Sequence, residues 1–210
     1  MNYRRNIGSS QDMSSEVYKS FIKDIDGIVR GIHLVGKNAA SGHKAKILAS
    51  GVAIPWALEA QQLLLEWGVS ADVWSVTSWT ELRKDGLASD EQKFLYPNND
   101  PTMPYLTGKL ADSEGPTLGV SDFMHSVPDM IRPWISGDYA TLGADGFGFS
   151  DTRAAARRYF KIDGPSIAVR VLEQLVAEQK IDPSIPQLAI DKYRLHEVAA
   201  GTSGTAGGVA

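Results

Sequence analysis

Short apolar or β-branched runs alternate along this chain with longer segments of helical periodicity. The runs with the length and composition of β-strands are Gly31–Val35, Lys46–Ser50, Asp72–Val76, Thr117–Ser121 and Tyr139–Gly143. Helical patterns fall between and after them. Because strands that alternate with helices favour right-handed crossover connections, this order predicts an α/β fold with a mainly parallel sheet and helices on both of its faces.

Three segments have the apolar spacing of amphipathic helices. Pro55–Glu66 begins with a proline in its first turn and is followed by Gly68, a helix stop. Asp151–Phe160 is preceded by a capping residue, either Ser150 or Asp151 itself, and Pro165–Gln179 repeats large apolar residues at helical intervals. We expect all three helices to pack on the sheet.

A long connection, Arg83–Met103, separates the third predicted strand from the next one. It contains prolines and an Asn-Asn-Asp turn, and a short helix is expected around Ser89–Leu95. Loops of this length often serve an interface, and an ordinary surface excursion explains the pattern equally well.

The two ends of the chain differ from its middle in composition. Residues 1–25 are polar and mixed in charge, which predicts a leader or linker, although Val17, Tyr18, Phe21 and Ile22 fit an amphipathic helical turn. Residues 199–210 are mostly Gly, Ala, Ser and Thr, and we expect this tail to be disordered. Residues 26–198 are then one domain of ordinary size.

Composition excludes several classes of function. A net charge of −4 gives no basic surface for nucleic acid, so small metabolites or proteins are the expected partners. The absence of cysteine excludes disulfides, thiolate metal sites and a cysteine nucleophile. No apolar run approaches the ~20 residues that span a bilayer, and no apolar signal core follows the first residues. We therefore expect no membrane partner and a cytoplasmic location.

A glycine-rich loop leads from the last predicted strand into the next helix. Its glycines, Gly143, Gly146 and Gly148, do not have the Gly-x-Gly-x-x-Gly order of a dinucleotide site, and Phe147 and Phe149 would crowd a pyrophosphate. We interpret the segment as a structural loop. Its glycines would permit positive φ, and its phenylalanines would pack between domains.

The histidines offer little catalytic chemistry. His33, His43, His125 and His196 lack the spacing that places two metal ligands on one helical face. His125 follows a strand at the edge where open α/β sheets bind ligands, so it either caps a helix or faces a cleft. No Gly-x-Ser-x-Gly elbow accompanies it, which argues against a hydrolase triad with Asp122.

Several colinear motifs between Asp26 and Leu195 have the pattern of one known family. They are Gly27–Ile32, Leu48–Ala53, Trp56–Ala60, Val76–Leu82, Ser121–Asp122 and Leu142–Arg153. In these motifs the chain resembles the carboxy-terminal domain of the homodimeric, actinobacterial-type pyruvate dehydrogenase. More widely, it resembles the carboxy-terminal domain of transketolases.

This resemblance implies a three-layer αβα fold with about five strands, the first of them antiparallel. It implies a parent oxidoreductase of glycolysis and pyruvate metabolism, which decarboxylates pyruvate with thiamine diphosphate and Mg²⁺. The parent transfers the acetyl group to the lipoyl-acyltransferase of a multienzyme complex and is a homodimer. In this family the cofactor and the catalytic residues belong to upstream domains.

The sequence agrees with a non-catalytic role for this domain. Thiamine enzymes hold Mg²⁺ with Gly-Asp-Gly and an asparagine roughly 25–30 residues later, because this hard cation prefers oxygen ligands. Gly137-Asp138-Tyr139 and Ala144-Asp145-Gly146 each lack one glycine, and no asparagine follows Asn99. We therefore expect no catalytic, cofactor or metal residues here, an inactive chain, and docking to the upstream domains of the same enzyme.

We assign structural or interface roles to eight individual residues. The candidates are Gly146, Phe147, Gly148, Ser150, Asp151, Arg153, Trp79 and His125. Trp79, Trp134, Phe147 and Phe149 would form an exposed apolar patch or belong to the core, whereas Trp56 and Trp74 are expected in the core.

Two alternatives remain open. Arg153, Arg157 and Arg158 lie on or near one helical face, which fits an anion or subunit contact, or a solvated face paired with carboxylates. The chain as a whole could instead be an independent module that binds a small anion or a nucleotide. Such a module would use Ser50-Gly51, Ser121-Asp122 and Ser150 at the carboxyl edge of the sheet.

Overall fold

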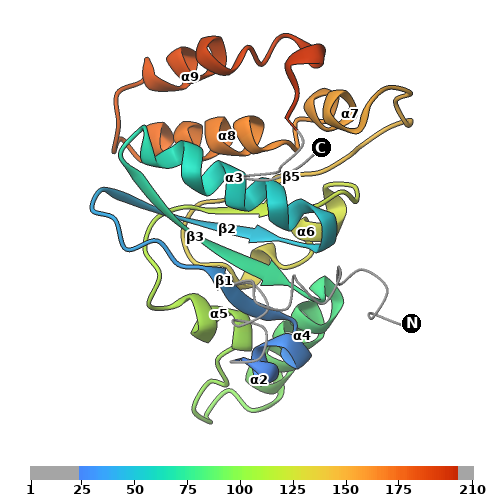
Figure 1. Cartoon of the computed structure of the whole chain (residues 1–210). Helices are drawn as coiled ribbons and strands as arrows, with labels where there is room; N and C mark the ends of the chain where they lie inside the picture. Colours follow the sequence, from blue (N-terminus) through green and yellow to red (C-terminus); the bar gives the residue numbers. More distant parts are fainter. Residues whose placement is uncertain (1–23, 203–210) are drawn as a thin grey trace.

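A five-stranded sheet forms the centre of the computed structural model, which describes residues 24–202 (Figure 1). The strands are β1 (Ile32–Gly36), β2 (His43–Ala49), β3 (Val69–Val76), β4 (Thr117–Val120) and β5 (Tyr139–Leu142), in the order β1-β3-β2-β4-β5. β1 is antiparallel to β3, and all other neighbours are parallel. The predicted fold, with its antiparallel first strand, is confirmed.

β2 and β3 both begin earlier than the apolar pattern predicted. Their first paired residues are His43 with Val69 and Lys44 with Ser70. The polar side chains among them lie before the apolar runs, so the pattern did not include them in the strands. The Lys44 amine donates to the carbonyl of Ala40 at 2.8 Å, so its charge is accommodated at the end of the strand.

One face of the sheet is covered by α3 (Ile54–Leu65) and α8 (Gly164–Ala177), with α9 (Ile185–Tyr193) on the outer side of α8 and α7 (Arg153–Tyr159) beside them (Figure 1). α3 and α8 bury apolar residues against the strands. No apolar pattern in the sequence predicted α9, which packs on α8. The Trp67 indole, just before β3, donates to the Tyr193 hydroxyl at 2.8 Å and so joins α9 to that part of the chain.

The other face carries a second apolar core. Its helices are α2 (Ile25–Arg30), α4 (Trp79–Leu95), α5 (Tyr105–Leu110), the short α6 (Ser126–Asp129) and the 3-10 turn η4 (Arg132–Trp134). Trp79 and Trp134 are buried in this core, together with Trp74. The interpretation of Trp79 and Trp134 as exposed patch residues is therefore wrong, and the core alternative holds for both.

The helix expected around Ser89–Leu95 is present as the last part of α4, but the prediction of a loop from Arg83 up to that helix is wrong, because α4 is continuous from Trp79 to Leu95. The Ser78 hydroxyl caps it by accepting from the backbone N–H of Glu81 at 3.1 Å. The buried positions of α4 include Gly86 and Ser89, so the helix shows little apolar periodicity in its sequence. Packing against the second core, rather than an amphipathic pattern, stabilises it.

The chain remains packed at residues 199–202, which we predicted to be disordered. The 3-10 turn η5 (Val198–Ala200) contacts α7, and the Thr202 hydroxyl donates to the Glu59 carboxylate at 3.1 Å. The rest of the predicted tail, residues 203–210, lies outside the described residues. So do residues 1–23, most of the predicted leader. Among the helices that the structure describes, none is long and apolar enough to cross a membrane.

Candidate functional site at the carboxyl edge of the sheet

The neighbouring strands β2, β4 and β5 all end at the same edge of the sheet. Ser50 follows β2 and Ser121 follows β4, and the Ser50 hydroxyl donates to the buried Ser121 hydroxyl at 3.2 Å. The Ser121 oxygen also accepts from the backbone N–H of Phe123 at 3.0 Å. These hydroxyls hold the strand ends and the loop after β4 together.

The loop after β4 is joined to the glycine-rich loop after β5 by several contacts. A Cβ on Gly143 would lie 2.7 Å from both the His125 nitrogen and the Phe123 oxygen, so this close approach requires glycine. The backbone N–H of Ala144 donates to the Phe123 carbonyl at 2.9 Å. The two loops therefore behave as one unit at this edge.

His125 and Asp145 form the polar part of that junction. The His125 backbone N–H donates to Asp145 Oδ1 at 3.0 Å, and His125 Nδ1 lies 2.5 Å from Asp145 Oδ2. The backbone hydrogen bond lowers the pKa of the Asp145 carboxyl, with a further contribution from the His125 side chain. His125 stands at the N-cap position of α6, but its side chain makes no capping bond there.

The roles predicted for the glycines and phenylalanines of this loop hold for some of these residues and not for others. Gly146 has a φ of 93°, whereas Gly143 is needed for close approach and a Cβ on Gly148 would meet open space. Phe147 is 97% exposed. Phe149 instead stacks on Tyr159, with ring centroids 4.4 Å apart, so it already has an aromatic partner within the chain.

Ser150, Asp151 and Arg153 are exposed at the start of α7. Neither Ser150 nor Asp151 is the cap that we predicted. The N-cap is Thr152, whose hydroxyl accepts from the backbone N–H of Ala155 at 3.2 Å. Asp151 supports this turn, because its Oδ1 accepts from the Thr152 N–H at 2.6 Å.

The three arginines of α7 do not share one environment. Arg153 is exposed, the Arg157 guanidinium lies 4.5 Å from the centre of the Trp56 ring, and Arg158 is buried in an ion pair with Asp163 at 2.7 Å. The prediction that all three arginines form one anion-binding face is therefore wrong. The alternative prediction, that all three lie on a solvated face, is wrong as well.

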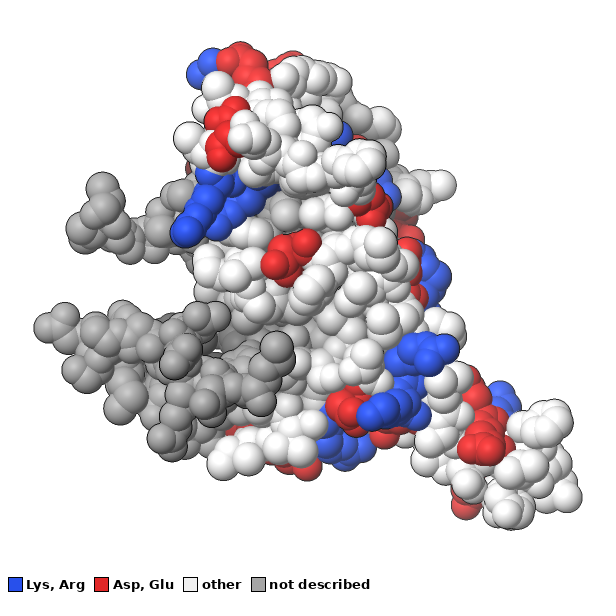
Figure 2. Space-filling model, turned by 90° about the vertical axis from the view of Figure 1, so that its right-hand side faces the viewer, with Lys and Arg blue, Asp and Glu red and all other residues white. Residues whose placement is uncertain are grey.

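Apolar side chains are exposed on the segments that follow β2, β4 and β5 and at the end of α7. We define the carboxyl-edge surface as Val52, Phe123, Met124, Phe147 and Tyr159. All but Phe147 are 49–56% exposed. Figure 2 shows this face of the molecule, where uncharged residues cover much of the centre, with an isolated acidic side chain among them. Exposed apolar area on adjacent loops is typical of a protein interface.

Sequence reasoning identified only Phe147 of this surface. Phe123 and Met124 had a usable signal, since two large apolar residues directly follow the polar Ser-Asp step that ends β4. Val52 had none, because it resembles the start of an apolar helix.

The described residues do not fit a magnesium–diphosphate group. Within residues 24–202, no three His, Asp or Glu side chains lie together in an arrangement that could hold a metal ion. His33 is buried in β1, which lies at the opposite end of the strand order from β4 and β5, the strands whose following loops carry His125 and Asp145.

The sheet order and the exposed apolar side chains at the carboxyl edge define a three-layer α/β domain with an interface-like surface. Residues 31–163 match the family model of the transketolase-like TK C-terminal domain. The chain belongs to this family, as its motifs predicted.

Curated relatives of the chain are pyruvate dehydrogenase E1 components. That of Mycobacterium tuberculosis is 51% identical over 184 residues, which cover 87% of this chain and 20% of the relative. That of Corynebacterium glutamicum is 46% identical over 175 residues, covering 83% and 19%. The chain thus spans about a fifth of the length of these relatives.

Among solved structures, transketolases are similar to the chain. A Pichia stipitis transketolase has a TM-score of 0.48 at 20% identity and covers 75% of this chain and 20% of its own. The transketolase from Leishmania mexicana has a TM-score of 0.47 at 19% identity and covers 75% and 19%.

Proposed function

We propose that this chain is the structural carboxy-terminal domain of a pyruvate dehydrogenase E1 component. Its carboxyl-edge surface would pack against the remainder of that enzyme. Family membership supports the proposal, and the observation on which it depends is the nearly complete exposure of Phe147 beside other apolar side chains.

The reaction of such an enzyme would be carried out outside this domain. Thiamine diphosphate and Mg²⁺ would be bound by upstream domains, where pyruvate is decarboxylated and the acetyl group passes to lipoyl-acyltransferase. The enzyme would be a cytoplasmic homodimer in a multienzyme complex that links glycolysis to pyruvate metabolism. In this proposal the present chain contributes a rigid surface and no reacting group.

The architecture of the edge suits that role. The Ser50–Ser121 hydrogen bond and the His125–Asp145 junction fix the loops before any partner arrives, so little conformational entropy is lost on docking. Complete burial of a phenylalanine side chain contributes about 1.5–3 kcal/mol. Phe147 alone would therefore change the affinity for its partner about 10-fold to 150-fold.

Binding between the chain and the rest of an E1 component tests this proposal. A polypeptide of the M. tuberculosis relative that ends before the homologous region, shown to be folded by circular dichroism, would be titrated with the chain in sedimentation velocity. We expect complex formation, and Phe147→Ser should weaken it at least about tenfold. The matched control is Phe94→Ser, since Phe94 is 83% exposed at the end of α4, outside the carboxyl-edge surface.

Two results would contradict the proposal. One is the absence of binding with both proteins folded, and the other is an equal effect of Phe147→Ser and Phe94→Ser. The alternative, an independent module for small anions or nucleotides, predicts instead a monodisperse chain whose melting temperature rises when phosphate or ATP is added.

A further inference from the structure

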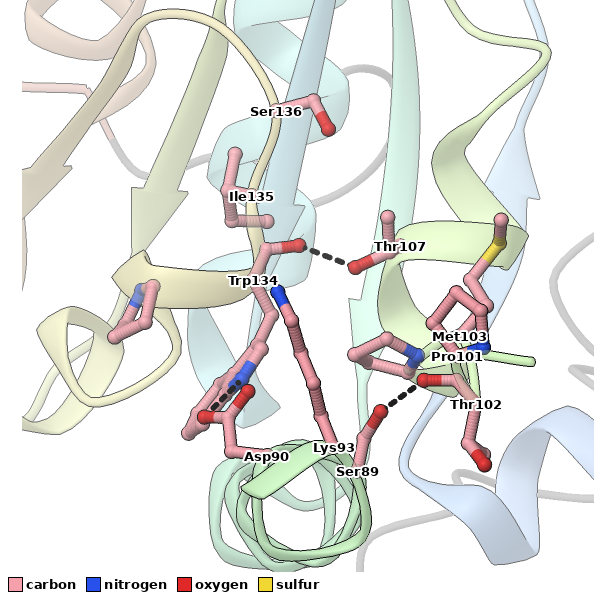
Figure 3. Close-up of a pocket in the computed structure, with 12 residues that line it drawn as sticks. Ser89, Asp90, Lys93, Pro101, Thr102, Met103, Thr107, Trp134, Ile135 and Ser136 are labelled. Carbon is pink, nitrogen blue, oxygen red and sulfur yellow. Dashed lines mark hydrogen bonds between the residues drawn. The ribbon is translucent and has the colours of Figure 1, made fainter. Parts of the chain in front are cut away.

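A hollow of about 330 Å³ opens on the α4 side of the sheet (Figure 3). It lies between α4, the segment before α5, α5 itself and η4. Lys93, Pro101, Met103, Thr107, Trp134 and Ile135 are among the residues that line it. None of its lining residues belongs to the carboxyl-edge surface, so its role is separate from the docking proposed above.

The wall made by Trp134 is fixed in position. The ring packs directly on α4 at Gly86, where a Cβ would lie 2.3 Å from the ring atom Cδ2. The indole N–H donates to Asp90 Oδ2 at 3.0 Å. Glycine at this turn of the helix therefore allows the ring to lie against the backbone, and Asp90 sets its orientation.

Two hydroxyl groups hold the remaining walls. Thr107 Oγ1 donates to the backbone carbonyl of Trp134 at 2.7 Å and so ties α5 to η4. The Ser89 hydroxyl donates to the carbonyl of Thr102 and ties the segment before α5 to α4 (Figure 3). A hollow with walls fixed in this way loses little conformational entropy when a ligand enters.

The lining combines apolar side chains with hydroxyl groups, the Asp90 carboxylate and the Lys93 amine. Figure 3 shows the Lys93 side chain rising from α4 past Trp134, with its amine directed into the hollow. Among residues 24–202, none accepts a hydrogen bond or forms an ion pair with that amine. The Asp90 carboxylate also lines the hollow and keeps its charge, but its hydrogen bond with the Trp134 indole directs it to that ring and away from the Lys93 amine (Figure 3).

We infer that this hollow binds a small carboxylate with an apolar body, whose anionic group pairs with Lys93. Ligand pockets are mostly apolar, carry a few placed polar groups and range upward from about 300 Å³, so the volume fits a small ligand. The proline, methionine and tryptophan side chains would contact the apolar body, and the Lys93 amine would orient the carboxylate.

The test uses 4-phenylbutyrate and its uncharged amide as probes. Each is titrated into the ¹⁵N-labelled full chain, and the indole N–H resonance of Trp134 is followed, after assignment with Trp134→Phe. We expect a saturable shift with the acid and about tenfold weaker binding of the amide, the ratio for loss of one charge-assisted hydrogen bond. Lys93→Met should weaken binding of the acid to the level of the amide.

Lys84→Met is the matched control, because Lys84 lies on the same helix, does not line the hollow and should leave the affinity unchanged. Ser136→Phe, at the exposed rim, should fill the opening and abolish binding of both probes without entering the core. The inference is overturned if the acid gives no saturable shift at millimolar concentrations, if acid and amide bind equally, or if Lys93→Met binds the acid as the unmodified chain does.

Discussion

Arg158→Met should destabilise the chain strongly, because Arg158 forms the buried ion pair of the described structure. Its Nε donates to Asp163 Oδ2 at 2.7 Å, and the two side chains are 1% and 0% exposed. Its Nη1 also donates to the carbonyls of Tyr193 and Arg194 at the end of α9. Removing one partner of such a pair typically costs about 3–5 kcal/mol, because the other charge stays buried.

We expect the lower end of that range. Asp163 would still accept hydrogen bonds from the backbone N–H of Ser166 at 3.2 Å and from the Ser166 hydroxyl at 2.5 Å. A loss of about 3 kcal/mol corresponds to a decrease in melting temperature of roughly 6–12 °C for a domain of this size.

Urea unfolding followed by tryptophan fluorescence measures the change in the free energy of unfolding. The matched control is Arg170→Met, since Arg170 pairs with Glu173 at 2.9 Å on the surface of α8 and such exposed pairs contribute about 0–1 kcal/mol. If Arg158→Met and Arg170→Met lower the unfolding free energy equally, the buried pair does not have the role that we assign to it.

Two further predictions concern a turn and a carboxyl group. Gly115 and Gly137 both have a φ of 82°, so alanine should cost about 1–2 kcal/mol of unfolding free energy at Gly137. It should cost about 1–3 kcal/mol more at Gly115, where a Cβ would lie 1.8 Å from the Lys44 carbonyl oxygen; equal urea midpoints would contradict this. Burial raises the pKa of Glu59 above its ordinary value of 4.5, despite the Thr202 hydrogen bond. The folded chain therefore keeps a proton on Glu59 at pH values where the unfolded chain has lost it, and the free energy of unfolding falls as the pH rises from 4.5 through the raised pKa. Glu59→Gln should remove this part of the slope in urea titrations from about pH 4 to 8, and an unchanged slope would contradict it.

The sheet was predictable from the sequence because its strands are apolar on both faces and are separated by helical patterns. α4 and α9 were not. α4 buries small and polar residues such as Gly86 and Ser89, and its burial depends on Trp134, which is distant in the sequence. α9 is a short helix with only Pro186 and Ala189 fully buried, so its apolar signal is weak.

The candidate surface was predictable only in part, for a similar reason. Phe147 stands out because it lies between two glycines in a loop, where no core position is available. Trp79 and Trp134 looked equally suited to an interface, yet both are buried in the second core, Trp79 as the first residue of α4 and Trp134 against Gly86 of that helix. Exposure of an aromatic residue depends on tertiary packing, which local sequence patterns do not contain.

The proposed role of this chain is to supply a docking surface, with the reacting groups of the enzyme in its upstream domains. Pyruvate-dependent reduction of an artificial electron acceptor, measured on the folded chain with thiamine diphosphate and Mg²⁺, tests it most directly. We expect no turnover by the chain alone. Cofactor-dependent turnover would contradict it, because the described residues would then include a thiamine site.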